Sequence, residues 1–121
     1  MTAAGTDDLG EASGEILEEA AALFGLLASP VRLRVLQILS QGESSVAAIA
    51  EQAGGALSTI SQHLSSLKLS GLVGARREGR RQVYFVKDPD AIAVMQVVIR
   101  QLVSQAGAKH GRPPGPRRNS P

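Results

Sequence analysis

The sequence of 121 residues has no cysteine or tryptophan and only three aromatic side chains. Without cysteine there can be no disulfide scaffold, no thiolate metal site and no cysteine nucleophile. Recognition of single-stranded nucleic acids is disfavoured, because it relies on aromatic side chains that stack on bases. Neither a phosphate-binding glycine loop nor a serine-hydrolase motif is present, and the two histidines are far apart in sequence. We therefore expect a protein that is not an enzyme.

Long apolar runs and a basic leader are also missing. The N-terminus is acidic, unlike the start of a signal peptide. No run of about eighteen apolar residues occurs, so we expect no membrane partner and a cytoplasmic location. Hydrophobic residues make up 43% of the chain and charged residues 20%, which is typical of a folded domain, and the length favours one domain.

Charge is unevenly distributed, although the formal net charge is only +2. Residues 1–19 contain six acids and no base, whereas residues 109–121 contain four bases and no acid. From Lys68 to Lys87 there are six bases and one acid, Glu78. Such a local excess of positive charge in a folded segment indicates a polyanionic partner. The alternative is a solvated charged hairpin.

Composition separates a folded centre from two tails. Residues 1–12 are small, polar and acidic, and residues 107–121 contain four prolines and three glycines. Both compositions predict disordered tails, the second of them basic. The folded domain is therefore expected within residues 13–106.

The periodicity of apolar residues predicts a mainly helical domain. Steps of three and four residues indicate helices over 14–28 and 46–53. Between them, Ser29-Pro30 predicts the start of a further helix and Gly42 its end.

The last helix is predicted over 89–105, with Asp88 as its N-cap before Pro89. It carries more apolar surface than a terminal helix of a small domain can bury on its own body. A second copy of the chain would cover this surface, most commonly with two-fold symmetry. The alternative is that the helix packs wholly within one chain.

The helix predicted over 57–69 has a polar face without charge before Lys68. Surface helices usually carry Glu and Lys, which are good helix formers. Short hydroxyl and amide side chains can instead approach base edges and phosphates closely. We interpret this face as a candidate for the major groove of DNA, the alternative being an ordinary serine-rich surface helix.

A β-hairpin is predicted directly after this helix. Two β-prone segments, 72–77 and 80–86, flank a Glu78-Gly79 turn, with arginines on both sides of the tip. Helices followed by a basic hairpin predict an α+β, mostly helical winged helix-turn-helix of five helices and a β-hairpin wing.

Four motifs in this order resemble the ArsR/SmtB family of dimeric bacterial winged-helix transcriptional regulators. They are ASPVRLRVL at 28–36, LSTISQHLSSL at 57–67, GLV at 71–73 and RREGRRQVYF at 76–85. The resemblance covers about residues 14–105, nearly the whole predicted domain.

The resemblance implies a homodimeric repressor that binds an inverted repeat in double-stranded DNA. The helix over 57–69 would enter the major groove, and the wing over 73–86 would contact phosphates or the minor groove. The residues that we expect to contact DNA are Ser58, Thr59, Ser61, Gln62, His63, Lys68, Arg76, Arg77, Arg80 and Arg81. The first and last helices would form the dimer interface, through Leu17, Leu23, Phe24, Ile92, Met95, Ile99 and Leu102.

This chain departs from the family's metal-sensing members. Where arsenic- and cadmium-type members carry cysteines, it has Ser45-Val46-Ala47-Ala48, which excludes a soft-metal site there. Zinc- and nickel-type members bind their metal with acidic side chains and histidines of the last helix; here the acidic residues are present and those histidines are not. Asp88, Asp90 and His110 are therefore the candidates for nickel or another divalent metal across a dimer. The serine that often caps the recognition helix is replaced by Ala56.

Several switching signals stay open from the sequence. One is a divalent metal at Asp88 and Asp90, another an organic ligand in the dimer interface, and a third a separate sensing partner protein. The metal and partner alternatives resemble actinobacterial nickel-responsive regulators. For His63 we expect a DNA or packing role rather than a metal. A different functional class, a winged-helix protein-interaction module, is opposed by the arginine-rich wing and the uncharged helix face.

Overall fold

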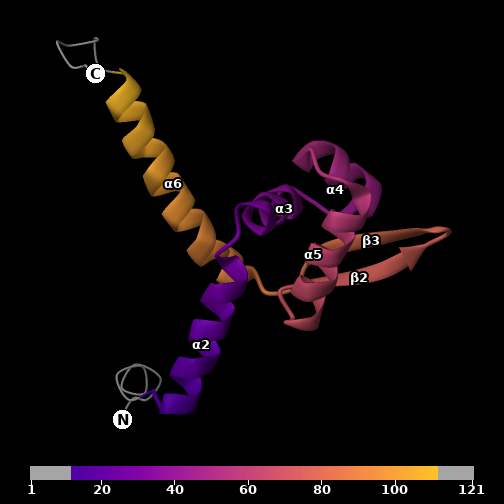
Figure 1. Ribbon diagram of the computed structural model, residues 1–121, viewed down its shortest axis with the longest axis horizontal. Helices are drawn as coiled ribbons and strands as arrows, with labels where there is room; N and C mark the ends of the chain where they lie inside the picture. Colours follow the sequence, from indigo (N-terminus) through magenta and orange to yellow (C-terminus); the bar gives the residue numbers. More distant parts are fainter. Residues whose placement is uncertain (1–11, 112–121) are drawn as a thin grey trace.

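The computed structural model describes residues 12–111, with side chains to residue 108. Its helices and strands follow the expected order, and they form the predicted α+β winged helix-turn-helix (Figure 1). The helices are α2 (Gly14–Leu27), α3 (Pro30–Ser40), α4 (Val46–Ala53), α5 (Leu57–Leu69) and α6 (Pro89–Gly111). The strands are β1 (Ser44–Ser45), β2 (Val73–Glu78) and β3 (Arg81–Val86).

Local capping explains where the helices begin. The first three are capped by serine hydroxyls that accept a hydrogen bond from the backbone N–H three residues further on: Ser13, Ser29 and Ser45. Asp88 does the same for α6, because its Oδ1 accepts from the N–H of Ala91 at 3.1 Å, as predicted. Helix α5 alone among these begins without a side-chain cap, since Ala56 occupies the N-cap.

The sheet contains one strand that the sequence did not predict. Strand β1 has two residues and pairs antiparallel with β3, so that the strand order is β1-β3-β2. A segment of two residues shows no periodicity, which is why it escaped prediction. The hairpin turn consists of Gly79 and Arg80 rather than Glu78-Gly79, because Glu78 pairs with Arg81. Gly79 has a φ of 63°, a conformation that favours glycine.

Helix α6 continues to Gly111, beyond the expected end at residue 105. Residues 1–11 and 112–121, which include most of both expected tails, lie outside the described residues.

The core lies where α3, α4 and α5 meet the sheet and the first half of α6. Its largest fully buried side chains include Leu36, Ile49 and Leu64. Ile92 and Met95 also belong to it, with only 5% and 4% of their surface exposed. They lie on the side of α6 that packs against the chain's own body, and Met95 also borders an apolar groove between α2 and α6, so their place in a dimer interface stays a prediction.

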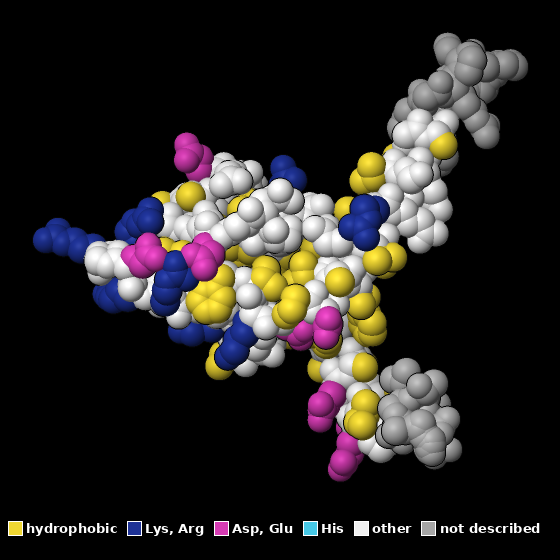
Figure 2. Space-filling model, turned by 180° about the vertical axis from the view of Figure 1, so that it is seen from behind, with side chains coloured by type: hydrophobic (Ala, Val, Ile, Leu, Met, Phe, Trp, Pro, Cys, Tyr) yellow, Lys and Arg dark blue, Asp and Glu magenta, His cyan; other side chains and the backbone are white. Residues whose placement is uncertain are grey.

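Helices α2 and α6 diverge from the body on the side opposite the wing (Figure 1). Large apolar side chains stay exposed along both, among them Leu17 at 59%, Phe24 at 57% and Leu102 at 58%. Figure 2 shows hydrophobic side chains gathered where the two helices leave the body. By length and composition alone, Pro89–Ala108 of α6 could also cross a membrane, at a mean hydropathy of 1.2.

Candidate nucleic-acid interface

Helix α5 presents the polar face that the sequence predicted. Ser58, Thr59 and Gln62 are exposed, and Ser61 is half-buried beside them. The opposite side of the helix is anchored in the core by three fully buried side chains, Ile60, Leu64 and Leu67. The helix is therefore held firmly, while its short polar side chains remain accessible to a ligand.

The wing lies next to this face. A surface groove is lined by Leu57 and Ser61 of α5 and by Arg81 and Gln82 of β3. Arg77, Arg80 and Arg81 are exposed near the hairpin tip, with Arg80 in the turn itself. Figure 2 shows basic side chains at the end of the hairpin. The polar helix face and the basic wing thus form one continuous surface.

The wing arginines differ in how their charge is balanced. Within the side chains that the structure describes, no ion pair involves Arg77 or Arg80. The Nη2 atom of Arg81 lies 3.8 Å from Oε1 of Glu78, and most of the Arg81 side chain remains exposed. These cations are accessible to a polyanion.

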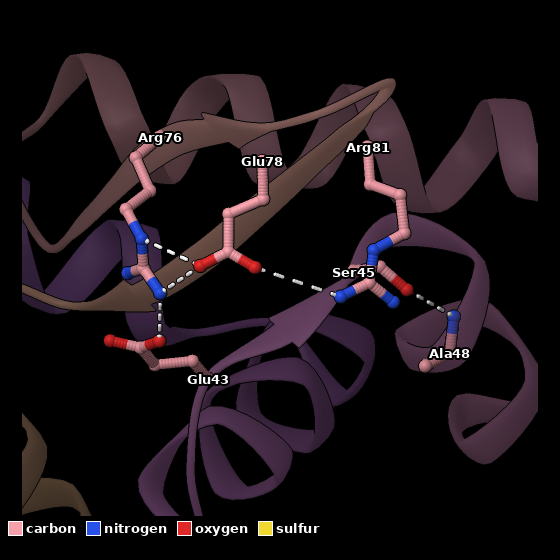
Figure 3. A network of polar contacts seen from close by, with 6 residues as sticks. All are labelled: Glu43, Ser45, Ala48, Arg76, Glu78 and Arg81. Atoms are coloured by element: carbon pink, nitrogen blue, oxygen red, sulfur yellow. Dashed lines mark hydrogen bonds and ion pairs between the residues drawn. The ribbon is translucent and has the colours of Figure 1, made fainter.

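Arg76, which was expected among the DNA contacts, is held within the chain (Figure 3). Its Nη2 donates to Oε1 of Glu43 at 2.5 Å and to Oε2 of Glu78 at 2.6 Å. The hydrogen bond from Arg76 holds the pKa of Glu43 below its ordinary value. The bonds to Glu43 and Glu78 raise the pKa of Arg76. Pairing thus stabilises the charged forms of Glu43 and Arg76.

His63 also has a partner inside the chain. The imidazole is half-buried, and its Nδ1 accepts a hydrogen bond from Nε of Arg32 on α3 at 3.1 Å. A second nitrogen of Arg32, Nη1, donates to the carbonyl oxygen of Leu26 at 3.5 Å. These bonds connect α5 to α3 and to the C-terminal end of α2, so the structure provides His63 with a packing role.

The candidate metal ligands do not form a described site. Asp88 is engaged in capping α6, and Asp90 is exposed on the first turn of the same helix. The side chain of His110 lies outside the described residues. Within the part of the chain that the structure describes, no group of three His, Cys, Asp or Glu residues could hold a metal ion.

The residues that sequence reasoning missed are partners of residues that it named. Glu43 lies 33 positions before Arg76, and Arg32 lies 31 positions before His63. No local pattern connects residues so far apart. The isolation of Glu43 as an acid between the second and third helices was the only available signal.

The chain is similar in sequence to known proteins. Residues 27–73 match the family model described as a helix-turn-helix domain. The chain is 44% identical over 86 residues to the HTH-type transcriptional regulator Rv0324 of Mycobacterium tuberculosis; this covers 69% of the chain but only 38% of that regulator. It is 39% identical over 88 residues to the probable mercury resistance operon repressor of Streptomyces lividans, covering 73% of the chain and 70% of that protein.

A solved structure shows the same fold. The homodimeric winged helix-turn-helix DNA-binding domain of Mb0332 from Mycobacterium bovis, a possible ArsR-family regulator, superposes with a TM-score of 0.66 at 35% identity. The match covers 91% of this chain and 95% of that domain. On the strength of this identity, coverage and fold, the chain belongs to the ArsR/SmtB family of winged helix-turn-helix transcriptional regulators, which are not enzymes.

Proposed function

We propose that this protein is a sequence-specific repressor that binds double-stranded DNA in the cytoplasm as a homodimer. The observation that carries the proposal is the continuous surface formed by the uncharged polar face of α5 and the basic wing. A helix with short polar side chains fits the major groove, and a basic hairpin fits the adjacent phosphates or minor groove.

The side chains on this surface suit different parts of the duplex. Gln62 is exposed and can bind adenine through two hydrogen bonds, while Ser58 and Thr59 can reach bases or nearby phosphates. Arg77, Arg80 and Lys68 supply the charge that neutralises phosphates, so we expect binding to weaken steeply with salt.

A second copy of the chain is the occupant that we propose for the apolar face of α2 and α6. Phe24 of α2 and Val98 and Leu102 of α6 border one apolar groove. An exposed apolar surface of this kind marks an interaction site. Because α6 also packs against α3 and carries Arg100, we assign its outer face to a protein partner rather than to a membrane. The related domain of Mycobacterium bovis is homodimeric, which supports the same assignment.

The experiment that tests this function is a titration of the DNA upstream of its own gene with the full chain, with competitor duplex present and over a range of salt concentrations. Sedimentation of the same protein measures its oligomeric state. We expect a dimer that binds the upstream duplex in preference to the competitor. A monomer at micromolar concentration, or the absence of binding even in dilute buffer, would contradict the proposal.

For the switching signal we propose an effector that the protein binds without thiolate ligands. The Streptomyces lividans relative is named for mercury resistance, but this chain lacks the cysteines that suit soft metals. The apolar groove between α2 and α6 favours an organic ligand bound at the dimer interface. Nickel or another divalent metal, and a sensing partner protein, are the other outcomes. A panel of metals added to the DNA titration tests the metal outcome directly.

A further inference from the structure

The proposed function leaves one polar network at the base of the wing unexplained. It joins Arg76 of β2 to Glu78 on the same strand and to Glu43, which precedes β1 (Figure 3). In the sheet order β1-β3-β2, strand β3 separates β2 from β1. The bond from Arg76 to Glu43 therefore spans the full width of the sheet.

The register shows what this bond crosses. Arg76 lies opposite Val83 of β3, and Val83 lies opposite Ser45 of β1. Residues paired across strands share one face of a sheet. The Arg76 side chain thus extends over the row that Val83 occupies, and Val83 is only 4% exposed. The network ties the outer strand of the wing to the segment that leads into α4.

An aromatic contact adds to the network. The guanidinium of Arg76 lies 6.0 Å from the centre of the Phe85 ring, at the outer limit of a cation–π interaction. Phe85 in turn lies opposite Gly74, so closely that a Cβ at Gly74 would stand 2.5 Å from the ring. Beyond these residues, the hairpin tip consists of exposed side chains and has no packing of its own to fix its direction.

The charge balance argues against a phosphate contact for Arg76. Two carboxylates, Glu43 and Glu78, surround the guanidinium of Arg76, and with Arg81 beside Glu78 the four side chains together have no net charge. A phosphate would have to displace both carboxylates and approach them closely. We propose that Arg76 and Glu43 are a positioning pair that fixes the wing for DNA binding, while Arg77 and Arg80 make the phosphate contacts. This inference rests on the proposed DNA-binding function.

The test compares variants of the full chain on the DNA upstream of its gene and on a random-sequence duplex. Glu43→Gln removes a negative charge and should tighten binding if only electrostatics matter. If Glu43 positions the wing, the substitution should instead weaken DNA binding about twofold to fivefold, which corresponds to the free energy that an exposed ion pair contributes. Glu51→Gln, at an exposed acid of α4, is the matched control and should bind at least as tightly as the unmodified chain.

The salt dependence separates the two roles of arginine. Arg80→Ala should reduce the slope of log affinity against log salt by about one, because one phosphate contact is lost. Arg76→Ala and Arg76→Lys should weaken binding with an unchanged slope, since a lysine keeps the charge but cannot donate to both carboxylates in the same geometry. A slope reduced in Arg76→Ala to the same degree as in Arg80→Ala would overturn the proposal.

Hydrogen exchange in the DNA-free protein gives an independent readout. In Glu43→Gln we expect faster exchange at the amides of residues 76–83, with protection of α3 and α5 unchanged. Unaltered exchange in the wing, or equal or tighter DNA binding by Glu43→Gln, would overturn the positioning role while leaving the proposed function intact. If the unmodified chain binds neither duplex, the proposed function fails and this inference fails with it.

Discussion

At the scale of single residues, the polar side chains of the proposed interface are of two kinds: some are exposed, and others are hydrogen-bonded to a partner within the chain. Gln62 is exposed on α5 and makes no hydrogen bond to another described side chain. Arg76 and His63 belong to the second group, because both are bonded within the chain. Residue type alone does not distinguish exposed side chains from internally bonded ones, since both arginine and histidine can donate hydrogen bonds to DNA as well as to the protein.

Replacing Gln62 by alanine should relax sequence discrimination. A bidentate contact to a base provides about 1–3 kcal/mol of discrimination, and a non-specific duplex does not use it. Binding to the upstream DNA should therefore weaken while binding to a random duplex stays the same, in competition titrations. Gln101→Ala, at an exposed glutamine of α6 on the side of the molecule opposite the wing, is the control. An equal loss on both duplexes would reassign Gln62 to a backbone contact.

Gly74→Ala should destabilise the protein. The added Cβ would stand 2.5 Å from Cζ of Phe85, so the ring must move and part of the wing must repack. Overpacking of this kind costs about 1–3 kcal/mol of unfolding free energy. Urea denaturation measures the change. Gly25→Ala is the matched control, because its Cβ meets no atom within 4 Å and alanine favours a helix. Equal stability of the two variants would contradict the expectation.

At the scale of elements, α5 is positioned by two kinds of contact. Its apolar side packs in the core, and His63 bonds to Arg32 on α3, which also reaches the carbonyl oxygen of Leu26 at the end of α2. The proposed recognition helix is thereby connected to a proposed dimerisation helix through one guanidinium.

His63→Ala tests that connection. The substitution leaves Nε of the charged Arg32 without its acceptor, which we expect to lower the unfolding free energy by about 1–3 kcal/mol. The DNA salt slope should not change, because no phosphate contact is lost. Urea denaturation and the salt titration give the two readouts, with Gln101→Ala, at an exposed glutamine of α6, as control. A reduced slope at full stability would show that His63 contacts DNA instead.

At the scale of the whole molecule, two exposed surfaces lie at opposite ends. The basic wing projects from one side and the apolar flanks of α2 and α6 from the other (Figures 1 and 2). Two-fold pairing through the apolar flanks would cover them and leave both wings accessible. Two copies of α5 could then enter successive major grooves of an inverted repeat.

Leu102→Glu should dissociate the dimer. Leu102 is 58% exposed on α6, and a carboxylate placed between two apolar faces would be desolvated without a partner. Sedimentation should show a shift toward monomer at micromolar concentration, together with weaker binding to the inverted repeat. Leu69→Glu is the matched control, since Leu69 is 90% exposed on α5 and does not border the apolar groove between α2 and α6. A dimer unchanged by Leu102→Glu would place the interface elsewhere.

The sequence by itself determined the helices, the wing and their order. Apolar periodicity, serine caps and turn glycines act within a few residues, so the expected 46–53 and 57–69 helices match α4 and α5. Only the tertiary structure decided three other features: the short strand β1, the inward packing of Ile92 and Met95, and the bond of Arg76 to Glu43. Each depends on contacts between residues that are distant in sequence and come together only after folding, and local sequence patterns do not predict such contacts.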